Sequence, residues 1–394
     1  MSGANIISPP VLIIGAGIGG LSLAHALLRH GVNFRIFEQA PEIKEVGAGI
    51  QIPPNAMKVL RALGLEDAIL SRAFQPESIE TRMGQTGREV FTIPLAEYSA
   101  TRWGVPYLHI HRAAYIAALL EGLPEDTVQL NAQAQSYSQT ADGVTLTLAD
   151  GTHVDGQYLI GADGIRSNIR EQMLGADAPK FTGNVAWRAV VPMERLGKFA
   201  PSPTACAWFG AGRHAVTYRL GAKGDLANFV GVVEREDWQE EGWSLRGDKA
   251  EALSDFAGWH PTIMTLIEQG ETFHKWALFD RDPLPTWVDG RVALMGDAAH
   301  PMLPFLAQGA AMATEDAWVL ANVIAAEEDL MTYQTRRYAR TSKVQAASRA
   351  NMGLFHKGSL PSQIASYGPM WLAGKLTPRI VHRRMDWLYG FDVT

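Results

Sequence analysis

Three glycines near the N-terminus have a spacing that suits binding of a phosphate-containing nucleotide. Gly15, Gly17 and Gly20 form a GxGxxG pattern directly after the apolar run Val11 to Ile14. The first glycine permits a tight turn, the second lets a pyrophosphate approach the backbone, and the third lets a helix pack against its strand. Glu38 ends the next apolar stretch about 20 residues on, where a carboxylate can accept hydrogen bonds from a ribose. The pattern predicts a dinucleotide site and leaves NAD and FAD open.

The elements that position these residues are a strand at 11–14, a helix from Gly19 to His30 and a second strand from Phe34 to Phe37. Four consecutive apolar residues suit a strand buried on both faces. The uncharged stretch from Asn5 to Leu28 is also long enough for a membrane span or signal peptide. Four glycines interrupt that stretch and no basic residue precedes it, so we expect no membrane span.

The amino-acid composition and net charge indicate which kinds of molecule the protein binds. The chain has 394 residues, 47% hydrophobic and 19% charged, with a formal net charge of −6. Such a chain can bury a large core in two domains, and its charge argues against nucleic acid as a partner, so we expect a small molecule. The single cysteine, Cys206, excludes an intrachain disulfide and fits a buried thiol in a reducing, cytoplasmic compartment.

Several segments in the first half have recognisable patterns. Residues 46–55 are too glycine-rich for regular structure, so we expect a loop against a ligand, followed by a helix at 56–63. Residues 79–98 alternate as in a β-hairpin, and Arg112 opens a helix at 113–121, where it could meet a phosphate. His109 and His111 share a strand face, but no third ligand lies nearby, so we expect packing and no metal site.

The residue pattern changes twice in the second half of the chain. Residues 128–154 suggest a three-stranded meander, and a buried strand at 158–160 leads into a turn that contains Asp163 and Gly164. Aromatic-rich alternating segments between 181 and 276 predict an antiparallel sheet. A strand is then expected to end at Gly296-Asp297, followed by a helix from Gly309 to Ile324 and a largely helical stretch over residues 329–394. The basic stretch at 379–384 suits a solvated face.

Three motifs together resemble those of the single-component FAD-dependent aromatic hydroxylases, the group of p-hydroxybenzoate hydroxylase, salicylate hydroxylase and 6-hydroxynicotinate 3-monooxygenase. They are the GxGxxG pattern, Gly161-Ala-Asp-Gly164 and Gly296-Asp-Ala-Ala-His-Pro301. The resemblance extends from Val11 to about Ser348. It implies an α/β fold: a Rossmann-like FAD-binding domain (1–180 and 277–340), a mostly antiparallel β-sheet substrate domain (181–276) and C-terminal helices (341–394). The hairpin near 76–105 is expected to join the substrate domain.

The resemblance also implies how FAD is held, without a covalent link. Arg112 would reach the FAD phosphates, Asp163 would touch FAD and the nicotinamide donor, and Asp297 would bond the ribityl chain. A carboxylate after a strand and a glycine suits a polyol, and the positive end of the helix at Gly309 suits the charge of a reduced flavin. The expected cofactor-binding residues are Gly15, Gly17, Gly20, Glu38, Gln51, Arg112, Asp163, Gly164, Asp297, Gly309 and Ala310.

The activity implied is that of an NAD(P)H- and FAD-dependent monooxygenase. It would hydroxylate a phenolic aromatic or heteroaromatic carboxylate, of the salicylate, hydroxybenzoate or 6-hydroxynicotinate type, through a flavin C4a-hydroperoxide. Only one dinucleotide fingerprint is present, so NADH or NADPH would bind transiently. A flavin reductase or dehydrogenase of the same fold and a non-catalytic flavin sensor are the alternatives. A homodimer is left open.

Candidate substrate residues come from the central sheet and the late loop. His214 and Tyr218 are four apart, so they point to one face of a strand, where they could bind and deprotonate a phenol. The alternative is that both pack in an aromatic interior. His300 fits a structural or flavin-orienting role, and Phe305 stands where the hydroxynicotinate branch leads us to expect histidine. The expected substrate-binding residues are Gln51, Arg188, His214, Tyr218, Pro301 and Phe305.

Overall fold

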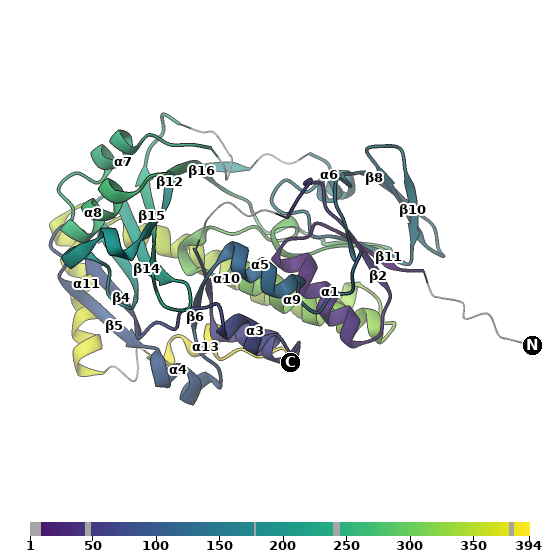
Figure 1. The fold of residues 1–394 in the computed structure, drawn as a ribbon, viewed down its shortest axis with the longest axis horizontal. Helices are drawn as coiled ribbons and strands as arrows, with labels where there is room; N and C mark the ends of the chain where they lie inside the picture. The colour runs from purple at the N-terminus through teal and green to yellow at the C-terminus, as the bar shows by residue number, and fades with distance from the viewer. Residues whose placement is uncertain (1–8, 44–48, 177–178, 239–244, 378–381) are drawn as a thin grey trace, which may run out of the picture.

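A mostly parallel six-stranded sheet forms one end of the molecule (Figure 1). The computed structural model describes residues 9–43, 49–176, 179–238, 245–377 and 382–394. Val11, Leu12 and Ile13 of the central strand are 0% exposed, which explains the uncharged run there. The strand order is β17 (Val288–Asp289), β18 (Val292–Leu294), β11 (Tyr158–Gly161), β1 (Val11–Ile14), β2 (Phe34–Phe37) and β7 (Val128–Gln129).

Two helices, one at each end of the cavity-facing part of the chain, pack together beside this sheet. Helix α1 (Ile18–Arg29) begins directly after the GxGxxG turn and lies against α9 (Gly309–Ala325), as Figure 1 shows. Helix α5 (Arg112–Leu120) also contacts α1. The strand, helix and strand predicted around the glycines are confirmed, as is the helix that begins at Gly309.

A small three-stranded sheet caps the same end of the molecule. It contains β8 (Ala134–Gln139), β9 (Val144–Leu148) and β10 (His153–Gly156), which confirms the meander. Val128 and Gln129 do not belong to it, because they pair in parallel with Ile36 and Phe37 of β2. Helix α6 (Asn168–Leu174) packs on β8.

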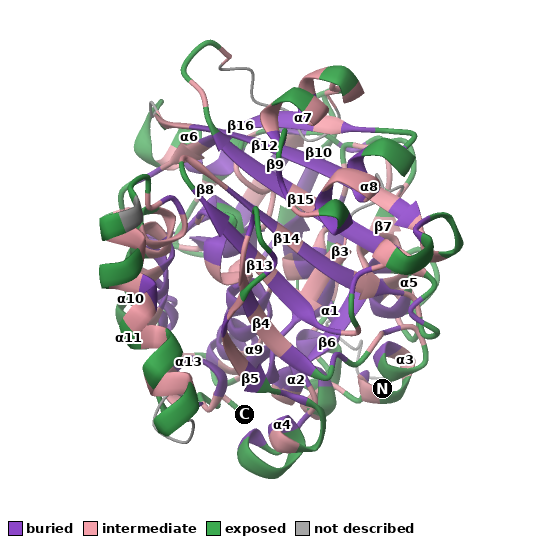
Figure 2. Cartoon of the chain, turned by 90° about the vertical axis from the view of Figure 1, so that its left-hand side faces the viewer, coloured by how far each residue is buried: buried purple, intermediate pink, exposed green. Residues whose placement is uncertain are grey.

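The second large sheet has seven strands and forms the other end of the molecule (Figures 1 and 2). The predicted antiparallel sheet is confirmed, and the β4–β5 hairpin joins it through a parallel pairing of β4 with β13. Helices α7 (Lys249–Asp255) and α8 (Pro261–Gln269) enclose an aromatic core on one face. The domain boundaries at 181 and 276 stay a prediction. The order is β16 (His274–Asp280), β12 (Lys180–Pro192), β15 (Leu226–Glu234), β14 (Arg213–Leu220), β13 (Ala205–Gly210), β4 (Ser78–Met83) and β5 (Glu89–Pro94).

The glycine-rich segment expected as an irregular loop is in part a strand. Gly49–Ile52 forms β3, which pairs antiparallel with β6 (Leu108–His111), while residues 46–48 lie outside the described part of the chain. The Gly49 amide also donates to Asn228 Oδ1 over 2.9 Å. The loop prediction was wrong here because distant residues supply the hydrogen bonds that fix this backbone.

Long helices connect the two ends. Helix α10 (Met331–Phe355) runs alongside α9 and reaches the seven-stranded sheet, and α11 (Leu360–Leu376) packs on β5. None of the helices in the described ranges is long and apolar enough to cross a membrane. Of the basic stretch, residues 378–381 lie outside the described chain, and Arg383 and Arg384 are exposed. The remaining helices are α2 (Pro54–Ala62), α3 (Glu66–Leu70), α4 (Ala96–Trp103) and α13 (Asp386–Tyr389).

Candidate functional site

A cavity of about 370 Å³, the central cavity, is bounded by both large sheets. One side follows the carboxyl ends of parallel strands β1, β11 and β18, where ligands bind in open α/β sheets. The other side is one face of the seven-stranded sheet. Its lining includes Gly17, Gly19, Gly49, Gln51, Arg112, Ala162, Gly164, Arg188, Val216, Tyr218, Trp276, Met295, Asp297, Met302, Leu303, Pro304, Gly309 and Ala310.

The three glycines of the N-terminal motif have different surroundings. Gly15 has φ +104°, and a Cβ there would lie 2.5 Å from the Ala162 carbonyl oxygen. A Cβ on Gly20 would lie 2.0 Å from the Gly15 oxygen. Gly17, by contrast, lines the cavity with nothing within 4 Å of its Cβ position. The first and third glycines therefore make the turn and the close packing, and the second leaves backbone open to a bound phosphate.

Glu38 acts on the protein backbone in this structure. Its two carboxylate oxygens accept hydrogen bonds from the Ala16 amide at 2.8 Å and the Ala40 amide at 2.9 Å. Glu38 thus ties the end of β2 to the glycine turn. This contact was not anticipated from the motif, which predicts only a ribose partner. Each carboxylate oxygen has a second lone pair, so both contacts are compatible.

Asp297, Arg112 and the first turn of α9 meet at the central cavity. Removal from bulk water raises the pKa of Asp297, and the neighbouring side chains His300, Arg112 and Arg170 oppose that rise. A Cβ on Gly309 would lie 3.8 Å from Asp297 Oδ1, so the carboxylate faces the helix N-terminus. A carboxylate that accepts hydroxyls, a guanidinium and a helix N-terminus suit a ligand with a polyol, a phosphate and an anionic ring.

Asp163 and Gly164, which are adjacent in one turn, have different surroundings. Gly164 lines the central cavity, together with Ala162 and Ile165. The Asp163 carboxylate instead faces the first turn of α6, where Oδ2 accepts from the Ile169 amide at 3.4 Å. Burial raises the pKa of Asp163. The structure therefore places Asp163 as a support of the turn, and the predicted contact to a ligand stays a prediction.

Three of the predicted substrate residues do line the cavity. Arg188, 5% exposed on β12, lies over the Trp276 ring at 5.2 Å from its centroid. Burial raises the pKa of Tyr218, which keeps its phenol neutral, and the Arg188 charge opposes the rise. Gln51 accepts a hydrogen bond from the Tyr107 hydroxyl, which orients its amide. A cation and a phenol thus face one apolar space, which suits an aromatic ring with an acidic substituent.

The other three lie behind the lining. In the part of the chain that the structure describes, the lining includes Val216 and Tyr218 but not His214, Pro301 or Phe305. His214 and Tyr218 share a face of β14, as expected, but four residues of strand separate them by about 13 Å. The His214 ring meets Phe305 edge-on, with ring centroids 5.2 Å apart. Its Nδ1 lies 2.7 Å from His356 Nε2.

Side chains on one face of α10 donate hydrogen bonds to the backbone of residues 301–305, the segment that covers the cavity. Gln345 donates to the Pro301 carbonyl at 2.8 Å, Ser348 to the Leu303 carbonyl at 2.6 Å, and Asn351 to the Phe305 carbonyl at 3.1 Å. Three consecutive residues of the segment, Met302, Leu303 and Pro304, line the cavity. Sequence reasoning missed this ladder, although donors at positions i, i+3 and i+6 of a helix share a face.

His300 belongs to a buried ion-pair network. Its Nε2 lies 2.5 Å from Asp316 Oδ2, which also accepts from the Gly296 amide at 3.0 Å. Arg337 donates hydrogen bonds to Asp316 at 2.8 Å and to Glu315 at 2.6 Å. All four side chains of this network are buried. The network fixes the turn that presents Asp297, which agrees with a structural role for His300.

The predicted pair His109 and His111 has packing and capping roles. His109 is buried and lies 4.7 Å from the Tyr218 ring, centroid to centroid. His111 Nδ1 accepts from the Ala113 amide at 3.3 Å and caps α5. No group of side chains suited to a metal ion occurs among the described residues.

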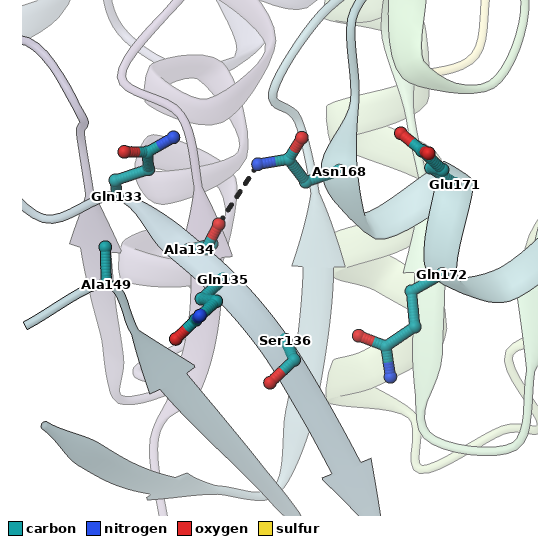
Figure 3. A pocket seen from close by; sticks show the side chains of 8 residues that line it. All are labelled: Gln133, Ala134, Gln135, Ser136, Ala149, Asn168, Glu171 and Gln172. Atoms are coloured by element: carbon teal, nitrogen blue, oxygen red, sulfur yellow. Dashed lines mark hydrogen bonds between the residues drawn. The ribbon is translucent and has the colours of Figure 1, made fainter. Parts of the chain in front are cut away.

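A second, more open hollow of about 600 Å³ lies between β8 and α6 (Figure 3). Its lining is polar, and its amides bridge the two elements: Asn168 donates to the Ala134 carbonyl at 3.1 Å, and Gln172 donates to the Tyr137 carbonyl at 2.6 Å. The hollow is therefore a hydrogen-bonded junction between β8 and α6. It lacks the buried charges and apolar wall of the central cavity.

Residues 8–348 match a family model described as FAD binding domain. The chain is 39% identical over 389 residues to 3-amino-4-hydroxybenzoate 2-monooxygenase PtmB3 of Streptomyces platensis, covering 98% of this chain and 96% of that protein. It is 37% identical over 391 residues to 6-hydroxynicotinate 3-monooxygenase of Bordetella bronchiseptica, with the same coverage of 98% and 96%. The structure of Klebsiella pneumoniae HpxO complexed with FAD and uric acid superposes with a TM-score of 0.86, at 28% identity and 97% coverage of each chain.

Proposed function

This chain belongs to the FAD binding domain family and is an FAD-dependent aromatic monooxygenase, and on that premise we propose that it hydroxylates a phenolic aromatic or heteroaromatic carboxylate with NAD(P)H and O₂. The observation that carries the substrate class is the pairing of buried Arg188 with Tyr218 on one wall of the central cavity. Relatives that act on hydroxybenzoates and hydroxynicotinate support it.

The residues of the cavity fit FAD. Open backbone at Gly17 and the guanidinium of Arg112 would hold the pyrophosphate, and Asp297 would accept hydrogen bonds from the ribityl hydroxyls. The first turn of α9, at Gly309 and Ala310, would face the pyrimidine edge of the flavin. When bound and reduced by NAD(P)H, FAD supplies the activated oxygen that attacks an electron-rich ring.

The substrate would lie between the flavin site and the seven-stranded sheet. Arg188 would pair with its carboxylate, because a buried guanidinium gains most from a planar anion with two acceptor oxygens. Tyr218 remains protonated, so its hydroxyl would donate a second hydrogen bond to that carboxylate, beside Arg188. Met302, Leu303 and Pro304 would exclude water from the ring.

The proton of the phenol needs an acceptor, and His214 is the proposed base. Burial and neighbouring His356 lower its pKa, so the ring is neutral at pH 7. Because the same shift disfavours the doubly protonated ring, His214 would take up the phenol proton only as another proton leaves it. His214 lies two residues from the lining residue Val216 on the same face of β14 and behind the lining, so it would reach the phenol through a bound water. A packing role, the alternative raised by the sequence, predicts instead that His214→Gln leaves turnover intact.

Comparing substrates with and without a carboxylate tests the proposed role of Arg188. KM is measured for two series, phenolic carboxylates and the same phenols without the carboxylate. Arg188→Met should raise KM for the carboxylates by about 10- to 100-fold, which is the equivalent of one charged hydrogen bond. KM for the phenols should change little, and Arg213→Met, on β14 of the same sheet and outside the cavity lining, serves as the control. Equal effects on both series would show that Arg188 does not hold the carboxylate. A reductase would transform the compounds without O₂, and a sensor would transform none.

A further inference from the structure

Three titratable side chains form a hydrogen-bonded line from the surface to the sheet behind the central cavity. Glu234 Oε1 lies 2.9 Å from His356 Nδ1, and His356 Nε2 lies 2.7 Å from His214 Nδ1. The Glu234 side chain is 57% exposed, whereas that of His356 is 3% exposed. His214 is buried against Phe305 and Phe355. The line thus connects solvent with the proposed base.

The members come from separate elements that meet here. Glu234 ends β15, His214 lies near the start of β14, and His356 directly follows the last residue of α10. In the sheet, Arg213 pairs with Val233 and His214 with Val232, so the end of β15 lies beside His214. Burial lowers the pKa of both rings; His356 lowers that of His214 further, whereas Glu234 opposes the fall at His356.

Hydrogen-bond direction assigns the tautomers. An ionised carboxylate can only accept, so His356 must carry its proton on Nδ1 and donate it to Glu234. His356 Nε2 is then an acceptor and requires a proton on His214 Nδ1. His214 Nε2 is left with a free lone pair, which is the form that a base needs. Reversing either ring would place two lone pairs or two protons against each other.

We propose that Glu234 and His356 are positioning residues that hold His214 with Nε2 unprotonated and carry its proton to and from solvent. This inference rests on the proposed role of His214 in the reaction. A phenol proton taken up at His214 Nε2 releases the Nδ1 proton to His356 Nε2. His356 in turn releases its Nδ1 proton to Glu234, which gives it to water. The proton that later returns to the product oxygen moves inward along the same atoms and restores the first tautomers.

The tautomers can be read without turnover, by ¹⁵N NMR of the FAD-loaded enzyme labelled at histidine. The signals of His214 and His356 are identified as those missing from His214→Gln and His356→Gln. At pH 7.5 we expect both rings to be protonated on Nδ1. Glu234→Gln should give mixed tautomers in His356, because its amide can donate as well as accept, whereas Glu236→Gln, at a nearby exposed site, should change nothing. Nε2-protonated His214 in the parent, or unchanged spectra in Glu234→Gln, would overturn the proposal.

Single-turnover kinetics tests the transfer itself. His356→Gln should slow product formation by about 10- to 100-fold and lose its pH dependence, with partial rescue by added imidazole, while reduction of FAD by NAD(P)H is unchanged. If His214→Gln is slow but His356→Gln matches the parent, the relay is wrong and His214 still acts alone. If the parent hydroxylates no phenolic carboxylate, the proposed function fails, and the tautomer experiment still decides the line.

Discussion

The Glu38 carboxylate accepts a hydrogen bond from the Ala16 amide over 2.8 Å, which joins the end of β2 to the turn that faces the central cavity. Removing this carboxylate should affect FAD in two ways, through the proposed ribose contact and through the shape of the turn. Charge-assisted hydrogen bonds of this kind contribute about 1.5 to 3 kcal/mol, so Glu38→Ala should weaken FAD binding by about 10- to 100-fold. Affinity is measured by fluorescence titration of the apoprotein.

Two comparisons complete that experiment. Glu125→Ala, at an exposed site, should retain parental affinity. Once saturated with FAD, Glu38→Ala should hydroxylate at nearly the parental rate, because Glu38 does not line the cavity in the described structure. Parental FAD affinity in Glu38→Ala would show that neither contact matters.

The ladder from α10 should control how well the cavity excludes water. Ser348→Ala removes the bond to the Leu303 carbonyl and leaves the segment at 301–305 less constrained. We expect a larger share of NAD(P)H oxidation to release hydrogen peroxide, with a modest rise in substrate KM. Ser342→Ala removes the same hydroxyl elsewhere on α10 and is the control. Parental coupling in Ser348→Ala would mean that the other two bonds suffice.

Buried His109 should make the protein less stable in acid. Burial lowers the pKa of His109 to about 3, well below that of an unfolded histidine. Between pH 6.5 and about 3 the unfolded chain therefore binds a proton that the native protein does not, and the free energy of unfolding falls as pH falls. The maximal contribution is about 1.4 kcal/mol per pH unit.

His109→Leu should accordingly flatten the dependence of unfolding free energy on pH. Urea unfolding of the FAD-saturated enzyme at pH 5.0, 6.0 and 7.5 measures this slope. His153→Leu, at an exposed position, should leave the slope as in the parent. An unchanged slope in His109→Leu would show that another group dominates acid sensitivity.

Local patterns in the sequence predicted the nucleotide-binding part of the fold well. The run from Val11 to Gly20 specifies its strand, turn and helix through residues that are adjacent in the chain, and steric limits at Gly15 and Gly20 bear this out. Gly49 shows where local reasoning fails, because its strand depends on pairing with β6 and on the side chain of Asn228.

The candidate site was predictable to a smaller extent for the same reason. Strand alternation placed His214 and Tyr218 on one face, but it carries no information about what covers that face. The contact of His214 with His356 joins residues 142 positions apart. The bond from Ser348 to Leu303 depends on how α10 lies against a proline-containing segment. Such contacts arise from tertiary packing and leave little periodic signal in the chain.

The central claim is that this protein inserts one oxygen atom from O₂ into a phenolic carboxylate. The most direct measurement supplies ¹⁸O₂ and NAD(P)H to the FAD-loaded enzyme with salicylate, hydroxybenzoates and 6-hydroxynicotinate, and analyses products by mass spectrometry. We predict one ¹⁸O atom in the product of at least one compound, with equal amounts of NAD(P)H consumed and product formed. Products without ¹⁸O, products formed equally without O₂, or NAD(P)H oxidation that yields only hydrogen peroxide with every compound would contradict the account.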